Sequence, residues 1–304
     1  MKRITLGALD YGLAFGVDRA LRQLAEHGRL SAVGAIVATE LWPREFRPLQ
    51  ETAEMVGKSV HFGVTLAFSG DRVSPVSTRM QEIYGERMFR REKLQRRALL
   101  RLLPDELLLD EAKAQLARYS VLMKRQPDFV AVREGLLERT ALARLVFKAI
   151  EHADFDVPPL LISPVSPGFK ASRLARLARP FGLQILQKAA PLPEIANREE
   201  LHRLLHNHFD GMTDRSFVAA IPGRPDDRLR RDEPRRKIAI RECQYEVLAS
   251  DRFPNAGQEG CFLELKRKNG SVGNRAVFRG GQEEGEGRPR FHDLRYRDIL
   301  LDCT

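Results

Sequence analysis

A single carboxylate, Asp10, stands at the end of an apolar run in the opening sequence ITLGALDYG. Acidic side chains are rarely placed at the end of a buried strand unless a cation or a hydrogen-bond donor binds them. The run itself holds no other charged residue. Asp10 is therefore the first candidate for a side chain that holds a ligand.

The sequence LHRLLHNHFD contains a second group of candidate metal ligands, His202, His206, His208 and Asp210. His202 and His206 are four residues apart and fall on one face of a helix, a spacing that can bind zinc. The alternative is an exposed helix end, where the helix dipole favours histidine. Both interpretations stay open at the level of the sequence.

A strongly basic segment, ERMFRREKLQRRALLR, predicts a partly amphipathic helix over residues 87–101. Its basic residues are Arg87, Arg90, Arg91, Lys93, Arg96, Arg97 and Arg101. Such a helix could bind an anionic membrane surface, a nucleic-acid backbone or an anionic glycan. The alternative is a solvated helix, because the basic residues lie all around it and no recognised nucleic-acid module accompanies them. The net charge of +10 permits both interpretations.

Strand and helix patterns alternate along most of the chain. Apolar runs predict strands at residues 3–9, 31–38, 59–68, 128–134, 158–165 and 216–223. Helical patterns lie at residues 17–27, 46–57, 141–153, 198–209 and 235–250, and a long helical stretch over 75–125 breaks near Pro104. This many alternations predict an α/β protein built as a barrel rather than a short open sheet.

Length, composition and cysteine content limit the class of protein. A chain of 304 residues with 43% hydrophobic and 30% charged residues is typical of a globular protein with a large core. No apolar stretch approaches the roughly 20 residues of a membrane span. Asp10 interrupts the run that could mimic a signal peptide, so we expect a cytoplasmic protein. The three cysteines form no C-x-x-C pair and indicate neither a disulfide framework nor a zinc knuckle.

The composition changes near residue 265. We expect residues 1–265 to form the barrel domain. Residues 266–304 are rich in glycine and charge and poor in pattern, which predicts a flexible tail.

Five segments, in this order, resemble the YdjC-like carbohydrate deacetylase family, which includes chitooligosaccharide deacetylases and hopanoid-associated members. They are GALDYGLAFGVDRAL, FGVTLAFSGDRVSP, DEAKAQLARYSVLMKRQPDFVAV, SFVAAIPGRPDD and RRKIAIRECQYEVLASDRFP, spread over residues 3–265. The resemblance implies a distorted (β/α) barrel of the glycoside hydrolase and deacetylase type. It also implies a divalent metal such as zinc or magnesium, held by one Asp and two His, with a second Asp as general base and a His as general acid.

Most of the residues that this resemblance implies are replaced in the chain. The metal-binding Asp falls on Asp10, but the general base falls on Leu9 and the general acid on Ile221. The two metal-binding His positions fall on Thr65 and Arg133. One carboxylate without a second ligand does not hold a hard cation in a defined geometry. We therefore expect no cofactor and an absent or vestigial deacetylase activity.

Three more residues bear on this site. Arg133 is hypothesised to pair with Asp10 and to replace the cation electrostatically. Arg241 begins the family's closing Arg-Glu pair, in which the Arg orients the base; without that base, a surface salt-bridging helix is an equal alternative. His61 precedes Thr65 by four residues on the same strand face, so a shifted alignment would make His61 a substitute ligand.

Three functions remain as hypotheses, because a fold alone does not imply a function. The leading hypothesis is a non-catalytic relative that binds a glycan, or a partner enzyme, in polysaccharide or glycolipid metabolism. The second is an active metal-dependent N-acetyl-sugar deacetylase with a relocated metal site, at His61 or in the histidine cluster. The third is an interaction protein that docks on an anionic membrane or nucleic acid through the basic helix. A homo-oligomer is compatible with each of them.

Overall fold

The structure is a computed structural model that describes residues 4–253. The described residues all belong to the first of the two units into which the chain divides, Met1–Leu263. The expected tail over residues 266–304 lies outside the described residues, as do Cys261 and Cys303. Cys243 is buried.

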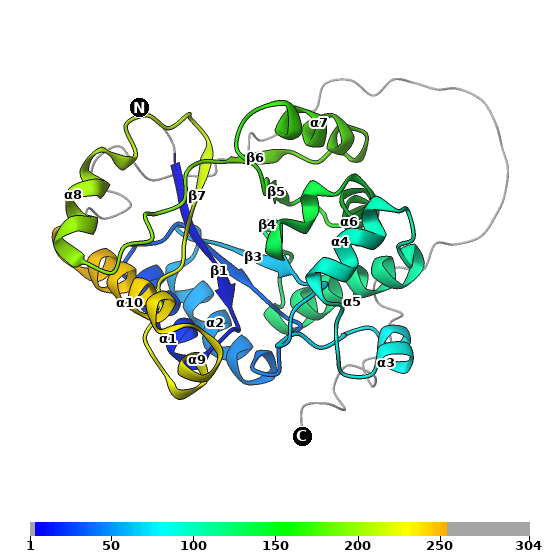
Figure 1. Cartoon of the computed structure of the whole chain (residues 1–304), viewed down its shortest axis with the longest axis horizontal. Helices are drawn as coiled ribbons and strands as arrows, with labels where there is room; N and C mark the ends of the chain where they lie inside the picture. The colour runs from blue at the N-terminus through cyan, green and yellow to red at the C-terminus, as the bar shows by residue number, and fades with distance from the viewer. Residues whose placement is uncertain (1–3, 254–304) are drawn as a thin grey trace, which may run out of the picture. The chain divides into compact units, whose positions relative to one another are not determined.

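Seven parallel strands close into a barrel in the order in which they follow along the chain (Figure 1). They are β1 (Ile4–Tyr11), β2 (Ala32–Ala35), β3 (His61–Leu66), β4 (Phe129–Val132), β5 (Leu160–Ile162), β6 (Ile185–Lys188) and β7 (Ser216–Ala220). The predicted distorted (β/α) barrel is confirmed. Because the strands are parallel, their carboxyl ends meet at one end of the barrel, where the connecting loops can build a site.

Helices surround the barrel and cover the outer face of its strands. They are α1 (Phe15–Glu26), α2 (Trp42–Val56), α3 (Thr78–Tyr84), α4 (Arg91–Leu99), α5 (Asp105–Met123), α6 (Thr140–His152), α7 (Phe169–Ala178), α8 (Arg198–His208), α9 (Asp227–Asp232) and α10 (Arg235–Ala249), with short 3-10 turns η1 (Arg133–Glu138) and η2 (Arg179–Phe181). Alternate strand residues such as Leu6, Val64 and Val218 are fully buried in the core between barrel and helices. None of the described helices is long and apolar enough to cross a membrane.

The stretch over residues 75–125 consists of three helices rather than the one broken helix that the sequence predicts. Gly85 ends α3 with a φ of 64°, a conformation that suits glycine. Pro104 is the N-cap residue of α5, so the predicted break is in place. The predicted basic helix over residues 87–101 begins only at Arg91, because Phe89 instead forms a β-bridge with Ser69.

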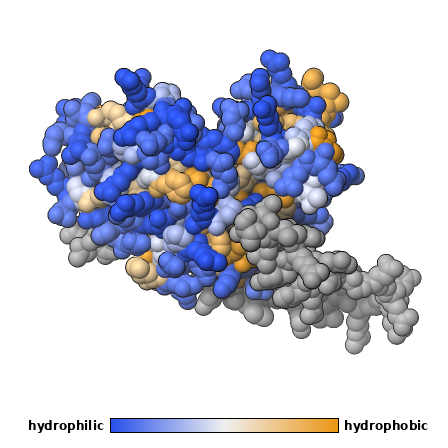
Figure 2. All heavy atoms as spheres, turned by 90° about the horizontal axis from the view of Figure 1, so that it is seen from below, coloured by the Kyte–Doolittle hydropathy of each residue, from blue (hydrophilic) through white to orange (hydrophobic). Residues whose placement is uncertain are grey.

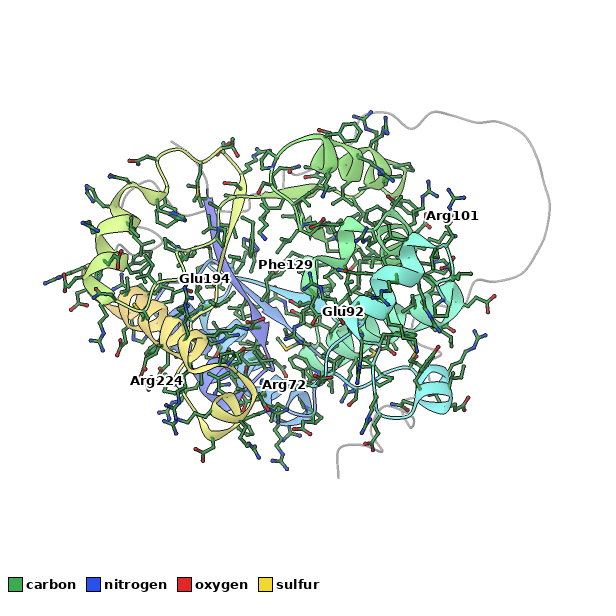
Figure 3. All side chains as sticks on the ribbon, viewed as in Figure 1. Arg72, Glu92, Arg101, Phe129, Glu194 and Arg224 are labelled. Atoms are coloured by element: carbon green, nitrogen blue, oxygen red, sulfur yellow. The ribbon has the colours of Figure 1, made fainter. Side chains whose placement is uncertain are left out.

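Glycines and phenylalanines fill the interior of the barrel. A Cβ atom on Gly7 would lie 2.6 Å from the Phe217 ring, so the ring lies directly over that glycine. A Cβ atom on Gly63 would lie 2.6 Å from the ring of Phe129, the residue labelled near the middle of Figure 3. The interior is therefore a packed core and not a channel, and a ligand can bind only at the barrel's end.

Candidate functional site

Asp10 lies in a bulge at the carboxyl end of β1. Ala8 pairs with Val33 and Tyr11 pairs with Ala35, so β1 takes three steps where β2 takes two. A bulge inserts one extra residue, re-aims the nearby side chains and is frequent beside functional sites. The side chain of Asp10 therefore does not follow the regular alternation of side chains between the two faces of the strand.

The partner of Asp10 is Arg241, which extends from α10 and has a side chain only 1% exposed. The Arg241 Nη2 donates to Asp10 Oδ2 at 2.8 Å. The Arg241 Nε donates to Glu233 Oε2 at 2.7 Å, and Nη2 also donates to Glu233 Oε1 at 3.0 Å. The Nη1 donates to the Ile221 carbonyl oxygen at 3.2 Å. One buried guanidinium thus joins two carboxylates and the end of β7.

The charges of this network stabilise one another. Burial alone would raise the pKa of Asp10, but Arg241 and, at longer range, Arg133 hold it below its ordinary value. Burial likewise opposes ionisation of Glu233, and Arg241 and Lys237 lower its pKa. The two carboxylates raise the pKa of Arg241 against its own burial. All three groups are therefore charged at neutral pH.

The hypothesised ion pair between Arg133 and Asp10 is wrong, because Arg241 occupies that place. Arg133 approaches Asp10 closely enough to lower its pKa but makes no ion pair with it in the described structure. The alternative of a surface salt-bridging helix is also wrong for Arg241, whose side chain faces the barrel end. Its geometry is that of a residue that orients a carboxylate, here Asp10.

The positions expected for base, acid and metal ligands do converge at the carboxyl end of the barrel. A Cβ atom on Gly34 would lie 2.6 Å from Thr65 Oγ1 and 2.8 Å from Leu9 Cδ2, so these side chains meet inside the barrel. Ile221 follows β7 and contacts Arg241 through its carbonyl group. Thr65 is 2% exposed, and its hydroxyl has no hydrogen-bond partner among the described residues.

His61 lies at the opposite, amino-terminal end of β3. It pairs in register with Ala32, which is itself level with Gly7, three residues before Asp10. Its Nδ1 lies 3.8 Å from Asp128 Oδ2. Each residue of a strand advances about 3.3 Å, so His61 lies well below the carboxyl end and its ring is directed to a different carboxylate.

The histidine cluster lies on α8, which packs against α10 outside the barrel. His202 Nε2 lies 3.5 Å from the Ser250 hydroxyl oxygen, and the His208 ring meets Phe209 edge-on. Burial lowers the pKa of His208. Within residues 4–253 no group of three or more His, Cys, Asp or Glu side chains has an arrangement that could hold a metal ion.

The basic segment lies on a different part of the molecule. Leu94 is buried, whereas Leu99 and Leu100 are exposed beside the arginines of α4. Arg90, Lys93, Arg96 and Leu100 are among the residues that line a shallow pocket there. Binding of an anionic surface by this segment stays a prediction.

Two further arginines at the barrel end were not singled out by sequence reasoning. Arg72, in the loop after β3, pairs with Asp232 at 2.9 Å through its Nε. Arg228, on α9, pairs with Glu40. In Figure 3, Arg72 is labelled just beyond the arrowhead of β1. No motif marked either residue: Arg72 is a single arginine in its loop, and Arg228 is one of three arginines on the short helix α9.

Burial lowers the pKa of Arg72, and nearby charges act in both directions. Glu233 raises the pKa, whereas repulsion from Arg228 and Arg133 lowers it further. Repulsion from Arg241 also lowers the pKa of Arg72. Four guanidinium groups therefore lie close together at one end of the barrel. The space-filling view from below shows a face of mostly hydrophilic residues, with some hydrophobic residues near its middle (Figure 2).

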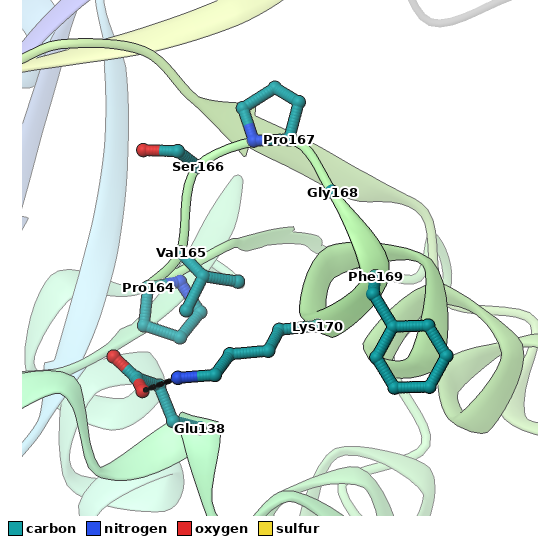
Figure 4. Close-up of a pocket in the computed structure, with 8 residues that line it drawn as sticks. All are labelled: Glu138, Pro164, Val165, Ser166, Pro167, Gly168, Phe169 and Lys170. Atoms are coloured by element: carbon teal, nitrogen blue, oxygen red, sulfur yellow. Dashed lines mark ion pairs between the residues drawn. The ribbon is translucent and has the colours of Figure 1, made fainter.

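A pocket of about 480 Å³ lies at the loop between β5 and α7 (Figure 4). Its lining residues are Glu138, Pro164, Val165, Ser166, Pro167, Gly168, Phe169 and Lys170. Lys170 Nζ and Glu138 Oε2 form an ion pair at 3.5 Å across it. The Phe169 side chain is 82% exposed at its rim, which is unusual for a large aromatic ring.

Comparison with known proteins identifies the family. The family model described as YdjC-like protein matches residues 3–259. The chain belongs to the YdjC-like family. No curated protein matches the chain. A crystal structure of a protein from Enterococcus faecalis V583, named for cellobiose-phosphate cleavage, is similar in fold, with a TM-score of 0.64 and 14% sequence identity. The similarity covers 82% of this chain and 91% of that one.

The residues present do not fit the divalent metal that the resemblance to YdjC-like deacetylases implies. Asp10 directs Oδ2 at a guanidinium, so one of its oxygens is already engaged by a cation. The two positions expected to supply imidazole carry the Thr65 hydroxyl and the Arg133 guanidinium, and a guanidinium has no lone pair to donate. The site thus offers a divalent cation one shared carboxylate, a hydroxyl and added positive charge.

Proposed function

We propose that this YdjC-like protein binds a carbohydrate at the carboxyl end of its barrel without deacetylating it. One observation carries the proposal: Arg241 is held between Asp10 and Glu233, while the two positions where the resemblance implies imidazole ligands carry Thr65 and Arg133. The guanidinium supplies the positive charge that Asp10 needs, but it cannot bind and activate a water molecule as a metal can.

The groups needed for proton transfer are also replaced. Leu9 and Ile221 carry no titratable atom, so neither takes a proton from water nor gives one to a leaving amine. Each such group contributes typically about 10²–10⁴ in rate, so the loss of both costs roughly 10⁴–10⁸. A site with this deficit is suited to binding rather than turnover.

The pocket beside α7 supports a carbohydrate as the bound molecule. It combines a flat, exposed aromatic ring with an ion pair and a serine, the mixture of apolar and directed polar groups that is typical of ligand sites. Phe169 offers a ring on which the apolar face of a sugar unit can stack, and Lys170 and Glu138 offer hydrogen-bonding groups to another unit of an oligomer. The pocket follows β5, so it lies on the loop side of the barrel that also bears Asp10.

Purified protein is expected to contain far less than one equivalent of zinc and to release no acetate from N-acetylglucosamine oligomers, with or without added zinc. The measurements are metal analysis by mass spectrometry and an acetate-release assay, beside an active deacetylase as positive control. One equivalent of bound metal together with turnover would establish the deacetylase hypothesis in its place.

Phe169→Ala is expected to weaken binding of N-acetylglucosamine oligomers by about 2- to 12-fold, because an aromatic contact is worth roughly 0.5–1.5 kcal/mol. Titration calorimetry on the full chain measures the affinity. Met55→Ala is the matched control, since Met55 is also a highly exposed apolar residue but lies on α2. Equal affinity of both variants and the wild type would show that the pocket is not the sugar site.

A further inference from the structure

Apolar side chains stand exposed at the end of α4, where the helix passes into the loop before α5. Leu99, Leu100 and Leu102 are 64%, 67% and 65% exposed. A single exposed leucine is ordinary on a protein surface, but three within four consecutive residues are not. This leucine patch indicates a contact with another molecule.

The leucine patch continues the basic segment, residues 87–101. This segment carries seven basic residues and a single acid, Glu92. All of its basic residues except Arg97 are exposed, and none of the exposed ones forms an ion pair among the described residues. Arg97 instead lies over the Phe89 ring, with its guanidinium carbon 5.6 Å from the ring centre. The segment therefore presents positive charge that the described protein does not neutralise.

The packing of α4 turns leucine and arginine to the same side. Leu94 is fully buried and marks the side of the helix that faces the core. Successive residues of a helix turn by about 100°, so Arg96 and Leu99 lie about 200° and 140° around the axis from Leu94. Figure 3 labels Glu92 near the first turn of α4 and Arg101 just past its last turn. The outer side of this helix thus combines apolar and positively charged groups.

Arg101 occupies a backbone position that suits glycine better. Its φ is 57°, in the left-handed region. The N–H of Leu102 then donates to the Arg97 carbonyl oxygen at 2.9 Å and closes the end of α4. Glycine is favoured at such helix ends because it has no Cβ atom. An arginine here lowers the stability of the turn while it adds positive charge beside the leucine patch.

We propose that the basic segment and the leucine patch dock the protein on an anionic lipid bilayer. The arginines bind the headgroups, and the leucines enter the boundary between headgroups and acyl chains. Attraction to anionic lipids and burial of apolar area are the two contributions that hold interfacial helices on membranes. Guanidinium groups also match the phosphate groups of lipids. The surface is separate from the carbohydrate site, so this inference does not depend on the proposed function.

The leucines favour a membrane over a nucleic acid as the partner. A nucleic-acid backbone offers phosphate oxygens to the arginines but no apolar region that would bury three leucines. Proteins that bind single strands add aromatic rings on which bases stack. The one aromatic residue of the basic segment, Phe89, is buried.

The test is sedimentation of the full chain with vesicles of phosphatidylcholine alone and with vesicles that also contain phosphatidylglycerol. At an ionic strength of about 0.1 M, where the Debye length is about 10 Å, the protein is expected to bind only the anionic vesicles. At about 1 M the Debye length falls to about 3 Å, and most of the binding is expected to be lost. Equal binding to both kinds of vesicle, or binding to neither at low salt, would overturn the proposal.

Two variants test the arginines. Arg96→Gln is expected to weaken binding to anionic vesicles about fivefold, the effect of one basic residue near such a surface. Arg203→Gln, which changes an exposed arginine on α8, is the matched control and is expected to leave the affinity unchanged. Arg101→Gly is expected to weaken binding by a similar factor while the melting temperature stays equal or rises, because glycine relaxes the left-handed turn. Unchanged binding by both Arg96→Gln and Arg101→Gly would overturn the proposal.

Leu99→Gln tests the leucine patch, because it removes apolar surface and keeps every charge. Binding to anionic vesicles is expected to fall about tenfold, the effect of withholding one leucine from an apolar medium. Met55→Gln, which changes an exposed residue on α2, is the control and is expected to have no effect. Vesicle binding that Leu99→Gln leaves unchanged would overturn insertion of the patch. Binding of duplex DNA that Arg96→Gln weakens, with no binding to vesicles, would overturn the membrane and assign the surface to nucleic acid.

Discussion

Arg241→Met is expected to lower the free energy of unfolding at pH 7 by about 3–5 kcal/mol, the range for breaking a buried ion pair by removing one partner. The substitution leaves Asp10 and Glu233 ionised and largely buried without their common guanidinium. It also removes the donor to the Ile221 carbonyl oxygen. Urea denaturation followed by circular dichroism measures the loss.

Arg198→Met is the matched control. Arg198 also forms an ion pair, with Glu246, but its side chain is mostly exposed on α8. Exposed pairs contribute about 0–1 kcal/mol. Equal losses in the two variants would contradict the central role that the structure gives to Arg241.

The pH dependence shows whether charge, and not only packing, causes the loss. In the wild type, the lowered pKa values of Asp10 and Glu233 contribute stability that is present above their unfolded values of about 4 and is lost as the pH falls through the folded values. Without Arg241, burial raises both pKa values, so protonation stabilises the variant. The difference between the two proteins should therefore shrink toward pH 3. A constant difference would indicate a lost packing contact.

The sequence predicts the barrel because its strands are apolar runs separated by helices. This pattern can be recognised without knowledge of the tertiary contacts. The helix boundaries between residues 75 and 125 are less predictable. There, Gly85 can either continue a helix at a small cost or end it in a left-handed conformation, and the bridge between Phe89 and Ser69 decides the outcome. That bridge joins residues far apart in the chain, so local pattern does not reveal it.

The site likewise combines a residue that its neighbours in the sequence mark with a contact between residues far apart in the chain. Asp10 stands out because an acid after an apolar run is locally unusual. The family resemblance marks Arg241 as an arginine that orients a carboxylate. Local pattern does not reveal its contact with Asp10, because Arg241 follows Asp10 by 231 residues and lies on a helix whose buried residues surround most of its axis. On such a helix a buried arginine has no pattern that distinguishes it from an exposed one. The hypothesis that Arg133 pairs with Asp10 named a residue of the correct charge at the correct end of the barrel, but Arg241 makes the contact.

The residues at the implied ligand, base and acid positions change what the barrel end can bind. The family resemblance implies carboxylates and imidazoles that hold a cation, whereas here Thr65 and Arg133 stand at the imidazole positions and Leu9 and Ile221 at the base and acid positions. These four substitutions remove the groups on which the implied deacetylation depends.

Gly63→Ala is expected to lower the free energy of unfolding by about 3 kcal/mol, the upper end of the usual cost of overpacking. The added Cβ would overlap the Phe129 carbonyl oxygen and lie 2.6 Å from the Phe129 ring. The ring can turn aside, but the carbonyl belongs to the neighbouring strand β4 and moves only with it. Chemical denaturation of the two proteins measures the difference.

Gly211→Ala is the control, because no heavy atom lies within 4 Å of the position of its Cβ and its φ is not in the left-handed region. Its stability should stay within about 0.5 kcal/mol of the wild type. The added variant Phe129→Leu separates the two causes of strain in Gly63→Ala. If the smaller side chain restores the lost stability, the ring alone was the obstacle and the strand backbone tolerates a methyl group. Persistence of the loss would place the strain in the approach of β3 to β4, the wall from which Thr65 and Arg133 reach the barrel end.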